Sequence, residues 1–253
     1  MSFSLCASAV YMMNDLLDLE SDRKHPRKRL RPFASGLVPI KYGVALAPAC
    51  LAVSLVFSLV VGAEFSAWLI AYFALTCAYS VALKRYALID CLTLAGLYTL
   101  RIIAGAAAVA VALSFWLLAF SAFIFLSLAF VKRYAELQVQ ATSGGMLIHG
   151  RGYLVSDAPL LQTLGITAGY ASVLVLALYL NGETVINLYR TPAFIWAAIP
   201  LMLYWISLVW MKAHRGEMHD DPIVFAIKDK ASLVGSMLIA VSFALATFGV
   251  GGQ

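Results

Sequence analysis

The acidic side chains near the start of this sequence are spaced so that they could share one metal ion. Asn14, Asp15, Asp18 and Asp22 follow an apolar run over residues 1–13. At about 100° per residue in an α-helix, these four fall within a sector of about 100°, whereas Glu20 points away from it. Mg²⁺ prefers hard oxygen ligands and binds through carboxylates, waters and substrate phosphate oxygens. We therefore predict that Asp15, Asp18 and Asp22 are the catalytic, metal-holding residues and that Asn14 helps to bind the substrate.

An ordinary solvated helix end is the alternative interpretation of these acids. It is disfavoured because carboxylates at the C-terminal end of a helix are opposed by the helix dipole. It also does not explain why the acids share one face, where like charges repel each other unless a cation lies among them. The sequence therefore favours a magnesium site with a substrate that carries phosphate.

A basic stretch follows the acids directly, with six Lys and Arg residues between positions 23 and 31. By itself it would be a membrane anchor on the cytoplasmic side. Beside carboxylates, the same charges can neutralise phosphate oxygens that magnesium does not reach. Pro26, Pro32 and Gly36 prevent a continuous helix, so we predict a loop over a bound anion. Arg23 and Lys28 are the predicted phosphate ligands, and the other basic residues are interpreted as anchors.

Three further segments place polar side chains at or below the same face. Tyr79 and Lys84 end one apolar helix. Arg101 lies about three turns below the charged surface, on the stripe that begins at Asp90. A basic residue at that depth is a candidate for function. The alternative is a structural role, in which Arg101 donates hydrogen bonds to helix carbonyls or to Asp90. A mixed-sign group closes a later helix and suits a phosphate or a sugar diol: Lys132, Arg133, Tyr134 and Glu136.

Composition indicates which elements carry these residues. Of the 253 residues, 62% are apolar and 12% are charged, with a mean hydropathy of +0.88. Soluble domains average about 25% charged residues, so lipid is the main solvent here. We predict an all-α, polytopic transmembrane helix bundle of eight helices with the following ranges: 2–19, 42–62, 65–83, 88–110, 114–134, 158–180, 193–212 and 231–250.

The basic residues orient this bundle. If successive helices alternate in direction, the stretches 20–41, 84–87, 132–157 and 212–230 share one face and carry all of the 18 basic residues except Arg101 and Arg190. The positive-inside rule then places that face, and the predicted active site, on the cytoplasmic side of the inner (plasma) membrane. The net charge of +5 is explained by orientation and anionic substrates, so we expect no nucleic-acid partner.

The beginning of the chain is short for a first membrane span. Only 13 residues precede Asn14, whereas a span needs about 20, and the signature of a signal peptide is missing. We therefore expect residues 1–253 to form one transmembrane domain that is incomplete at its N-terminal side.

The pattern Asn-Asp-x-x-Asp-x-x-x-Asp at positions 14–22 resembles the first Asp-rich motif of the UbiA superfamily of membrane prenyltransferases. The spacing of Tyr79 and Lys84 and the stretch 100–105 (Leu-Arg-x-x-Ala-Gly) agree with this resemblance, which covers essentially the whole chain. It implies a nine-helix bundle with a lipid-side opening and a cytoplasmic cap. It also implies an Mg²⁺-dependent transferase with an isoprenoid lipid substrate and a diphosphate-bearing co-substrate.

Many members carry a second acidic motif where this chain has Lys132-Arg133-Tyr134-Ala135-Glu136. That departure, with the basic stretch after Asp22, is similar to the decaprenyl-phosphate phosphoribosyltransferase branch. This branch transfers 5-phosphoribosyl from phosphoribosyl diphosphate to a polyprenyl phosphate. One alternative is transfer of a prenyl group from its diphosphate to an aromatic acceptor. An alternative of another class is a membrane transporter, which should show internal repeats and polar residues near the bilayer midplane.

Overall fold

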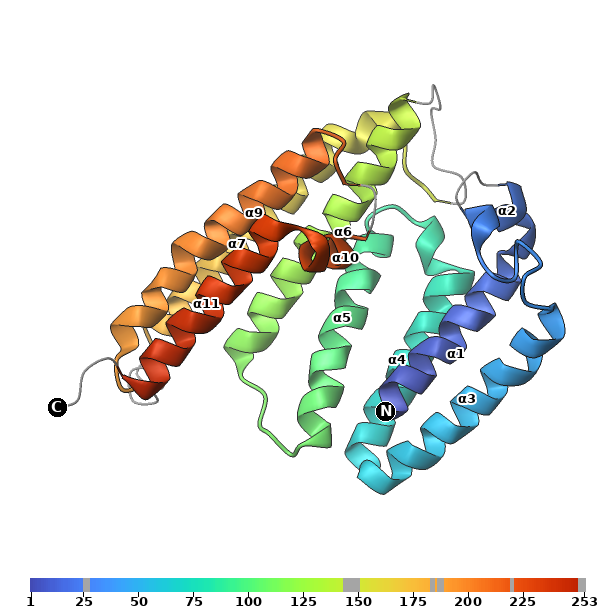
Figure 1. Ribbon diagram of the computed structural model, residues 1–253, viewed down its shortest axis with the longest axis horizontal. Helices are drawn as coiled ribbons and strands as arrows, with labels where there is room; N and C mark the ends of the chain where they lie inside the picture. The colour runs from blue at the N-terminus through green and yellow to red at the C-terminus, as the bar shows by residue number, and fades with distance from the viewer. Residues whose placement is uncertain (25–27, 143–150, 183–184, 186–188, 219–220, 250–253) are drawn as a thin grey trace. The chain divides into compact units, whose positions relative to one another are not determined.

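The computed structural model describes residues 1–24, 28–142, 151–182, 185, 189–218 and 221–249, and it is helical throughout these ranges apart from turns and connections. Figure 1 shows the helices in chain order. Their bounds are as follows: α1 Ser2–Leu17, α2 Leu19–Lys24, η1 Lys28–Leu30, α3 Ile40–Val61, α4 Ala63–Val81, η2 Leu83–Arg85, α5 Ile89–Ala108, α6 Phe115–Thr142, η3 Val155–Asp157, α7 Ala158–Leu180, η4 Pro192–Ala197, α9 Ala198–His214, α10 Pro222–Lys228 and α11 Lys230–Phe248.

Seven helical segments within the described ranges are long and apolar enough to cross a membrane. The helix α1 has 16 residues and is not among them. The predicted all-α bundle of membrane helices is thus confirmed, and the chain is a multi-pass membrane protein. The seven segments are Ile40–Val61, Ala63–Val81, Ile89–Ala108, Phe115–Thr142, Val155–Leu180, Pro192–His214 and Lys230–Phe248.

The chain forms two compact units, each described by itself below. Unit 1 comprises residues 1–83 and 100–112, and its centre is α1, which packs against α3 and α4 (Figure 1). Ser2 and Ser54 join α1 to α3 by reciprocal bonds, because each hydroxyl donates to the carbonyl of the other residue at 2.7 and 2.8 Å. Small residues with satisfied hydroxyls let two membrane helices approach closely.

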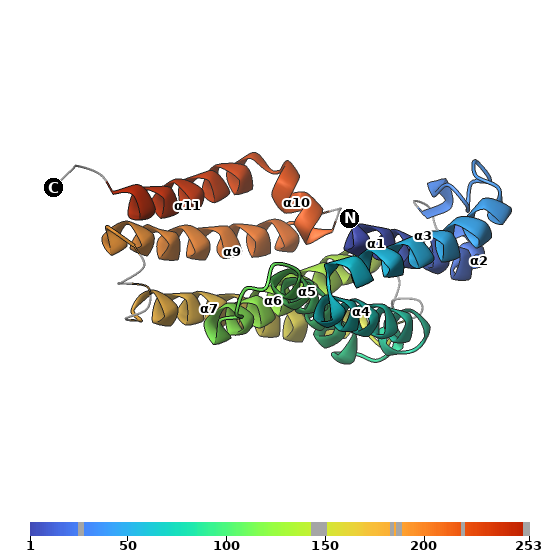
Figure 2. The same cartoon turned by 90° about the horizontal axis from the view of Figure 1, so that it is seen from below.

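Unit 2 comprises residues 84–99 and 113–253, with its core where α6, α7 and α9 meet. Figure 2 shows α9 between α7 and α11. Gly165 of α7 makes this packing possible: a Cβ atom there would lie 2.2 Å from the Trp210 ring and 2.7 Å from Phe130 Cβ. Ser127 of α6 completes the junction by donating to the Gly165 carbonyl and accepting from the Trp210 indole.

The structure corrects three predicted boundaries. The first helix ends at Leu17, and residues 19–24 form a separate helix, α2. Lys132 and its neighbours do not close a helix, because α6 continues to Thr142; the ion pair between Arg133 and Glu136, one turn apart, supports this extension. Within the stretch 212–230, which was predicted only as a connection between membrane helices, residues 222–228 form the short helix α10.

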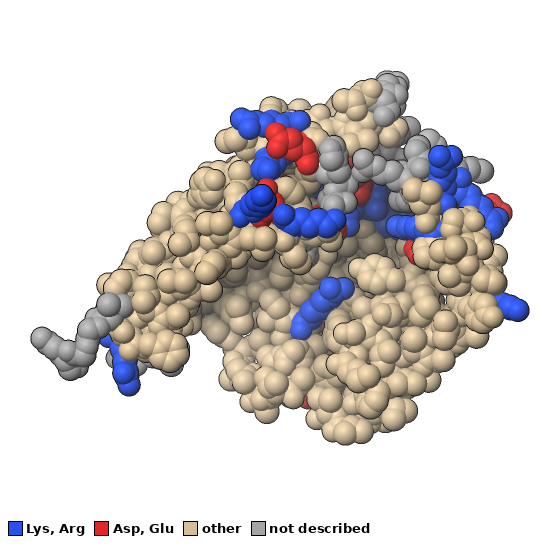
Figure 3. Space-filling view, in the orientation of Figure 1, with Lys and Arg blue, Asp and Glu red and all other residues tan. Residues whose placement is uncertain are grey.

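The charges lie mainly at helix ends. On the face seen in Figure 3, the flanks of the helices are largely tan, whereas most Lys and Arg side chains gather near α2 and near the C-terminal end of α9 and α10. This distribution is expected for helices whose flanks contact lipid.

Candidate functional site

The acid cluster of unit 1 consists of Asp15, Asp18, Asp22 and Arg31. Arg31 donates from one guanidinium nitrogen, Nη1, to Asp15 Oδ1 at 2.9 Å and to Asp22 Oδ2 at 2.8 Å. The Asp22 side chain is only 2% exposed, whereas that of Arg31 is 37% exposed. Two carboxylates from different helices therefore converge on one cationic point.

The backbone explains why the acids remain in phase although the helix is interrupted. Asp18 is the C-cap of α1, and its N–H donates to the Asn14 carbonyl, while the Asp22 N–H donates to the Asp18 carbonyl. Both bonds connect residues four apart, so the helical spacing continues through the break. Asp15 and Asp22 are seven residues apart, about two turns, and thus share a face as predicted, whereas Glu20 is exposed.

The loop that carries Arg31 is anchored to the helices. Phe33 is buried, and its ring lies over Gly43 of α3, where a Cβ atom would be 2.8 Å from the ring; Leu16 of α1 lies beside the same position. The Ser35 N–H donates to the Arg31 carbonyl at 2.9 Å. These contacts hold the Arg31 backbone next to the ends of α1 and α2.

The carboxylates of the acid cluster fit magnesium only as a pair. In the described ranges, no three His, Cys, Asp or Glu side chains are close enough together to hold a metal ion. Asp15 and Asp22, which reach the same nitrogen atom, still fit Mg²⁺, because this ion needs only one or two carboxylates beside water and phosphate oxygens. The structure thus brings together two of the three predicted ligands. The third, Asp18, lies between them in the sequence and is half-buried.

The remaining predicted ligands around the first unit are placed as follows. Asn14 and Tyr79 are half-buried in α1 and α4. Arg23 is exposed, and its Nε donates to the Ala34 carbonyl at 3.4 Å, so it contacts the loop that carries Arg31. Lys28 begins η1, but its side chain lies outside the described part of the chain. Lys84 is half-buried in η2, at the start of unit 2.

Arg101 faces inward within unit 1, as the stripe along its helix indicates. Its Nη2 donates to the Tyr72 hydroxyl at 2.7 Å, and its guanidinium lies 5.3 Å from the Tyr72 ring centroid and 6.0 Å from that of Phe3. The suggested partner Asp90 is instead paired with other residues, described next. Aromatic rings and a phenol therefore stabilise Arg101.

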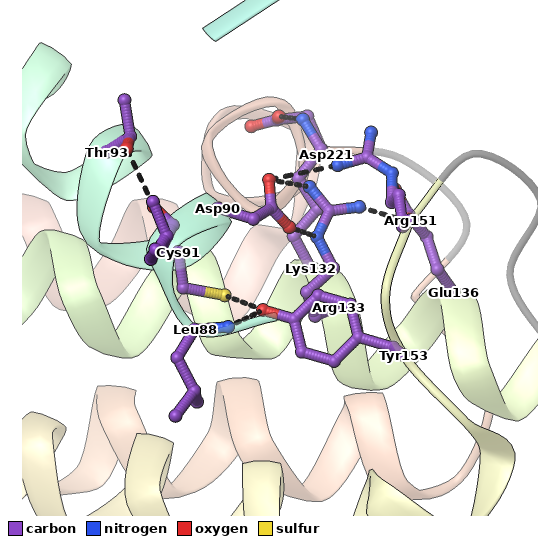
Figure 4. Close-up of polar contacts among 11 residues, drawn as sticks. Leu88, Asp90, Cys91, Thr93, Lys132, Arg133, Glu136, Arg151, Tyr153 and Asp221 are labelled. Carbon is purple, nitrogen blue, oxygen red and sulfur yellow. Dashed lines mark hydrogen bonds and ion pairs between the residues drawn. The ribbon is translucent and has the colours of Figure 1, made fainter. Parts of the chain in front are cut away.

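Unit 2 contains a second group of charges, the buried ion cluster of Asp90, Arg133, Glu136 and Arg151 (Figure 4). Arg133 and Asp90 are both fully buried, and Arg133 Nε lies 2.5 Å from Asp90 Oδ2. Arg133 also pairs with Glu136, and Arg151 donates to Asp90 Oδ1 at 3.1 Å. Two carboxylates and two guanidinium groups thus neutralise each other, which joins α5, α6 and the segment before α7.

The segment before α7 is fixed a second time by Tyr153. Its buried hydroxyl accepts from the Leu88 N–H at 2.8 Å and lies 3.4 Å from Cys91 Sγ (Figure 4). Burial raises the pKa of the Tyr153 phenol, which therefore stays protonated. Leu88 has a positive φ of 65°, a conformation that costs free energy for a residue with a side chain. The bond that the Leu88 N–H donates to Tyr153 helps to maintain that turn at the beginning of α5.

The other predicted residues of α6 are also paired. Lys132 is 34% exposed, and its Nζ donates to Asp221 Oδ2 at 2.6 Å (Figure 4). Tyr134 is buried, with its hydroxyl 2.9 Å from His214 Nδ1, and it accepts from Gln138 at 2.6 Å. The sequence thus placed these side chains on one helix correctly, but each already has a protein partner.

Sequence reasoning missed two basic residues that these clusters need. Arg31 was interpreted as a membrane anchor and Arg151 only as one of the charges that orient the bundle, yet each bridges two carboxylates. The sequence contained one signal for Arg31, because acidic residues outnumber basic ones at positions 14–22. Acids that share one face of a helix require a cation, and the adjoining loop is rich in arginine. Arg151 gave no comparable local signal.

Together, the membrane helices and the acid cluster at a helix end define a multi-pass membrane protein with a polar site at one helix terminus. Residues 1–144, more than half of the chain, match the UbiA prenyltransferase family. The chain belongs to this family of membrane transferases.

Similar proteins extend the match along the chain. It is 40% identical over 247 residues to the uncharacterized protein y4nM of Sinorhizobium fredii, and the alignment covers 97% of this chain and 48% of y4nM. It is 37% identical to the nodulation protein NoeC of Azorhizobium caulinodans, over 92% of this chain and 76% of NoeC. The chain thus spans about half of the first relative and about three quarters of the second.

Several similar proteins have a name that states an activity, decaprenyl-phosphate phosphoribosyltransferase. The chain is 38% identical over 167 residues to a decaprenyl-phosphate phosphoribosyltransferase of Mycolicibacterium smegmatis, which covers 66% of this chain and 52% of that enzyme. Among solved structures, a UbiA homolog from Archaeoglobus fulgidus bound to GPP and Mg²⁺ matches with a TM-score of 0.69. It covers 97% of this chain and 85% of the homolog at 14% identity, which supports the fold alone.

Proposed function

We propose that this chain is an Mg²⁺-dependent transferase that displaces diphosphate from its donor substrate at the cytoplasmic face of the inner membrane. The observation that carries the proposal is the convergence of Asp15 and Asp22 on one cationic point beside an arginine-rich loop. When bound there, magnesium would supply Lewis-acid stabilisation of the negative charge on the leaving diphosphate. Asp15 and Asp22 would provide the carboxylate ligands, Asp18 would act beside them, and Asn14 would orient a phosphate oxygen or a bound water.

We further propose phosphoribosyl diphosphate as the donor and a polyprenyl phosphate as the acceptor. The support is the similarity to decaprenyl-phosphate phosphoribosyltransferases and the lack of a second acidic motif at positions 132–136. In this reaction a phosphate oxygen of the acceptor forms a bond to C1 of the ribose, while the bond from C1 to diphosphate breaks and diphosphate leaves with the electron pair. The nucleophile is already an anion, so the reaction requires no general base from the protein.

The predicted substrate-binding residues are assigned two different roles. In this proposal Arg23, Lys28, Tyr79 and Lys84 bind phosphate groups, and Lys132 can do so by exchanging Asp221 for a substrate oxygen. Three other residues are enclosed by protein partners, and we assign them to positioning the helices that carry the site: Arg101, Arg133 and Tyr134. Glu136 belongs with them because it pairs with Arg133.

The donor can be identified by following label into lipid. Membranes containing the protein are incubated with phosphoribosyl diphosphate labelled in the ribose and with a polyprenyl phosphate, with and without Mg²⁺. We expect magnesium-dependent label in the lipid extract. If the lipid remains unlabelled while the same preparation transfers a prenyl group from its diphosphate to an aromatic acceptor, the phosphoribosyl assignment is wrong. If the preparation catalyses neither reaction, the proposed transferase function is wrong.

A further inference from the structure

The cation between Asp15 and Asp22 is supplied by the protein itself. Nη1 of Arg31 bonds to both carboxylates, at the point where the proposed function places a metal ion. A guanidinium and a magnesium ion cannot both occupy this point, because like charges in contact repel each other. The arrangement therefore requires one cation to replace the other.

We propose that Arg31 is a built-in counter-ion that competes with magnesium for Asp15 and Asp22. Metal loading then requires the guanidinium to leave both carboxylates, and Arg31 sets how tightly the metal is held. This inference rests on the proposed function, in which these acids hold Mg²⁺.

Burial explains why the Asp22 carboxylate needs a counter-ion. The Asp22 carboxylate is almost completely excluded from solvent, and an ionised carboxylate in that position is strongly disfavoured unless a charge and hydrogen bonds compensate it. Arg31 provides both, with a donor in direct contact. Asp15 belongs to α1 and Asp22 to α2, so the same guanidinium also joins the two helices across the break at Asp18.

The surroundings of Arg31 allow its side chain to leave while its backbone stays in place. More than a third of the side chain is exposed, so solvent can accept the guanidinium. The backbone is held by the Ser35 N–H, by the bond from the Val38 N–H to the Pro32 carbonyl, and by burial of Phe33. The exchange is therefore a side-chain rotation, for which the long arginine chain has several rotamers.

A binding experiment with Mn²⁺ tests the competition without any turnover. The protein is purified in detergent without divalent ions, and free Mn²⁺ is measured by electron paramagnetic resonance during titration. Arg31→Gln should bind Mn²⁺ about tenfold more tightly than the unaltered protein, at the lower end of what one neighbouring charge does to an ionisation equilibrium. Arg29→Gln is the matched control, since Arg29 is an exposed arginine of the same loop, and its affinity should stay unchanged.

A second measurement uses the unaltered protein and so does not depend on a variant that folds. Phenylglyoxal modifies accessible arginines, and mass spectrometry gives the rate at each position. Magnesium should accelerate modification of Arg31 several-fold, because the guanidinium leaves its two carboxylates, whereas the rate at Arg29 should stay the same. A rate at Arg31 that is unchanged or slower with magnesium would show that no exchange takes place.

The outcomes separate this inference from the function on which it rests. If Mn²⁺ binds equally tightly to the unaltered protein and to Arg31→Gln, or more weakly to the variant, Arg31 is not a competitor, although the metal site stands. If Mn²⁺ binds to neither protein, the acids do not hold a metal ion, and the proposed metal site fails together with the inference.

Discussion

In unit 1, Asp15 and Asp22 both bond to one nitrogen of Arg31, with Asp18 close by in sequence. In unit 2, by contrast, Asp90 and Glu136 are matched by Arg133 and Arg151. The two groups also differ in exposure: the Arg31 side chain is 37% exposed, whereas Arg133 is fully buried and Arg151 is 20% exposed. A cation that solvent can reach can be exchanged for another cation, whereas carboxylates and guanidinium groups that pair around a buried centre hold each other in place.

This contrast changes the interpretation of the basic residues in α6. The sequence suggested that Lys132 and Arg133 form one anion-binding pair, but they belong to separate ion pairs on different sides of the helix, with Asp221 and Asp90. Only Lys132 is partly exposed. The support for a phosphoribosyl donor therefore comes from the similar proteins and the missing acidic motif more than from free positive charge on α6.

The largest expected effect is on stability, from removal of the buried guanidinium. Arg133→Gln should lower the free energy of unfolding by about 3–5 kcal/mol, because it leaves Asp90 buried without its main partner. Thermal unfolding in detergent and the yield of folded protein measure this loss. Arg215→Gln, at an exposed position of the same unit, should stay within about 0.5 kcal/mol. Should Arg133→Gln keep its stability but lose transfer activity, Arg133 acts on the substrate and the contrast between the clusters is wrong.

The second effect concerns turnover in the acid cluster. Asp15→Asn should lower the rate of magnesium-dependent transfer by about 10²-fold, because a neutral amide stabilises a divalent ion and its diphosphate poorly. Folding should be largely retained, since Asp22 keeps its bond to Arg31. The matched control is Glu20→Gln, an exposed acid of α2 outside the shared face, which should transfer at the unaltered rate. Equal losses in both variants would mean that general negative charge, and not the cluster, is required.

The smallest effect is expected at an ion pair that belongs to neither cluster. Asp229 caps α11 by accepting from the Ser232 N–H at 2.9 Å and from Lys212 at 2.9 Å. Burial alone would raise the pKa of Asp229, but these hydrogen bonds lower it overall. Asp229→Asn keeps a side chain that can cap the helix but loses the charge that pairs with Lys212, so it should cost about 0.5–1 kcal/mol near neutral pH. Glu217→Gln, which removes a more exposed partner of Lys212, should cost less.

The pH dependence of this difference has a definite sign. Because the folded-state pKa of Asp229 lies below its unfolded value, the stabilisation is complete above the ordinary Asp pKa of about 3.9 and is lost as the pH falls through the folded value. Melting temperatures of the unaltered protein and Asp229→Asn should thus converge below about pH 4. Curves that stay parallel into acid would show that the charge of Asp229 contributes nothing.

Helix positions were predicted well because they depend on local properties. The ranges 88–110 and 158–180 correspond to Ile89–Ala108 and Ala158–Leu180, since runs of about 20 apolar residues fit the bilayer thickness. The predicted end at residue 134 was wrong, because charged residues in α6 were interpreted as a helix terminus. They are accommodated inside the helix by partners from elsewhere in the chain.

The acid cluster shows the same division between local and distant information. By itself, the sequence determined the membrane helices and the common face of Asp15 and Asp22, because hydrogen bonds between residues four apart fix the phase of a helix. Only the tertiary structure decided that Arg31 bonds to both of those acids, and that Arg133 and Arg151 pair with Asp90. These pairs depend on how loops such as the one anchored by Phe33 pack against the helices, and no local pattern encodes that packing.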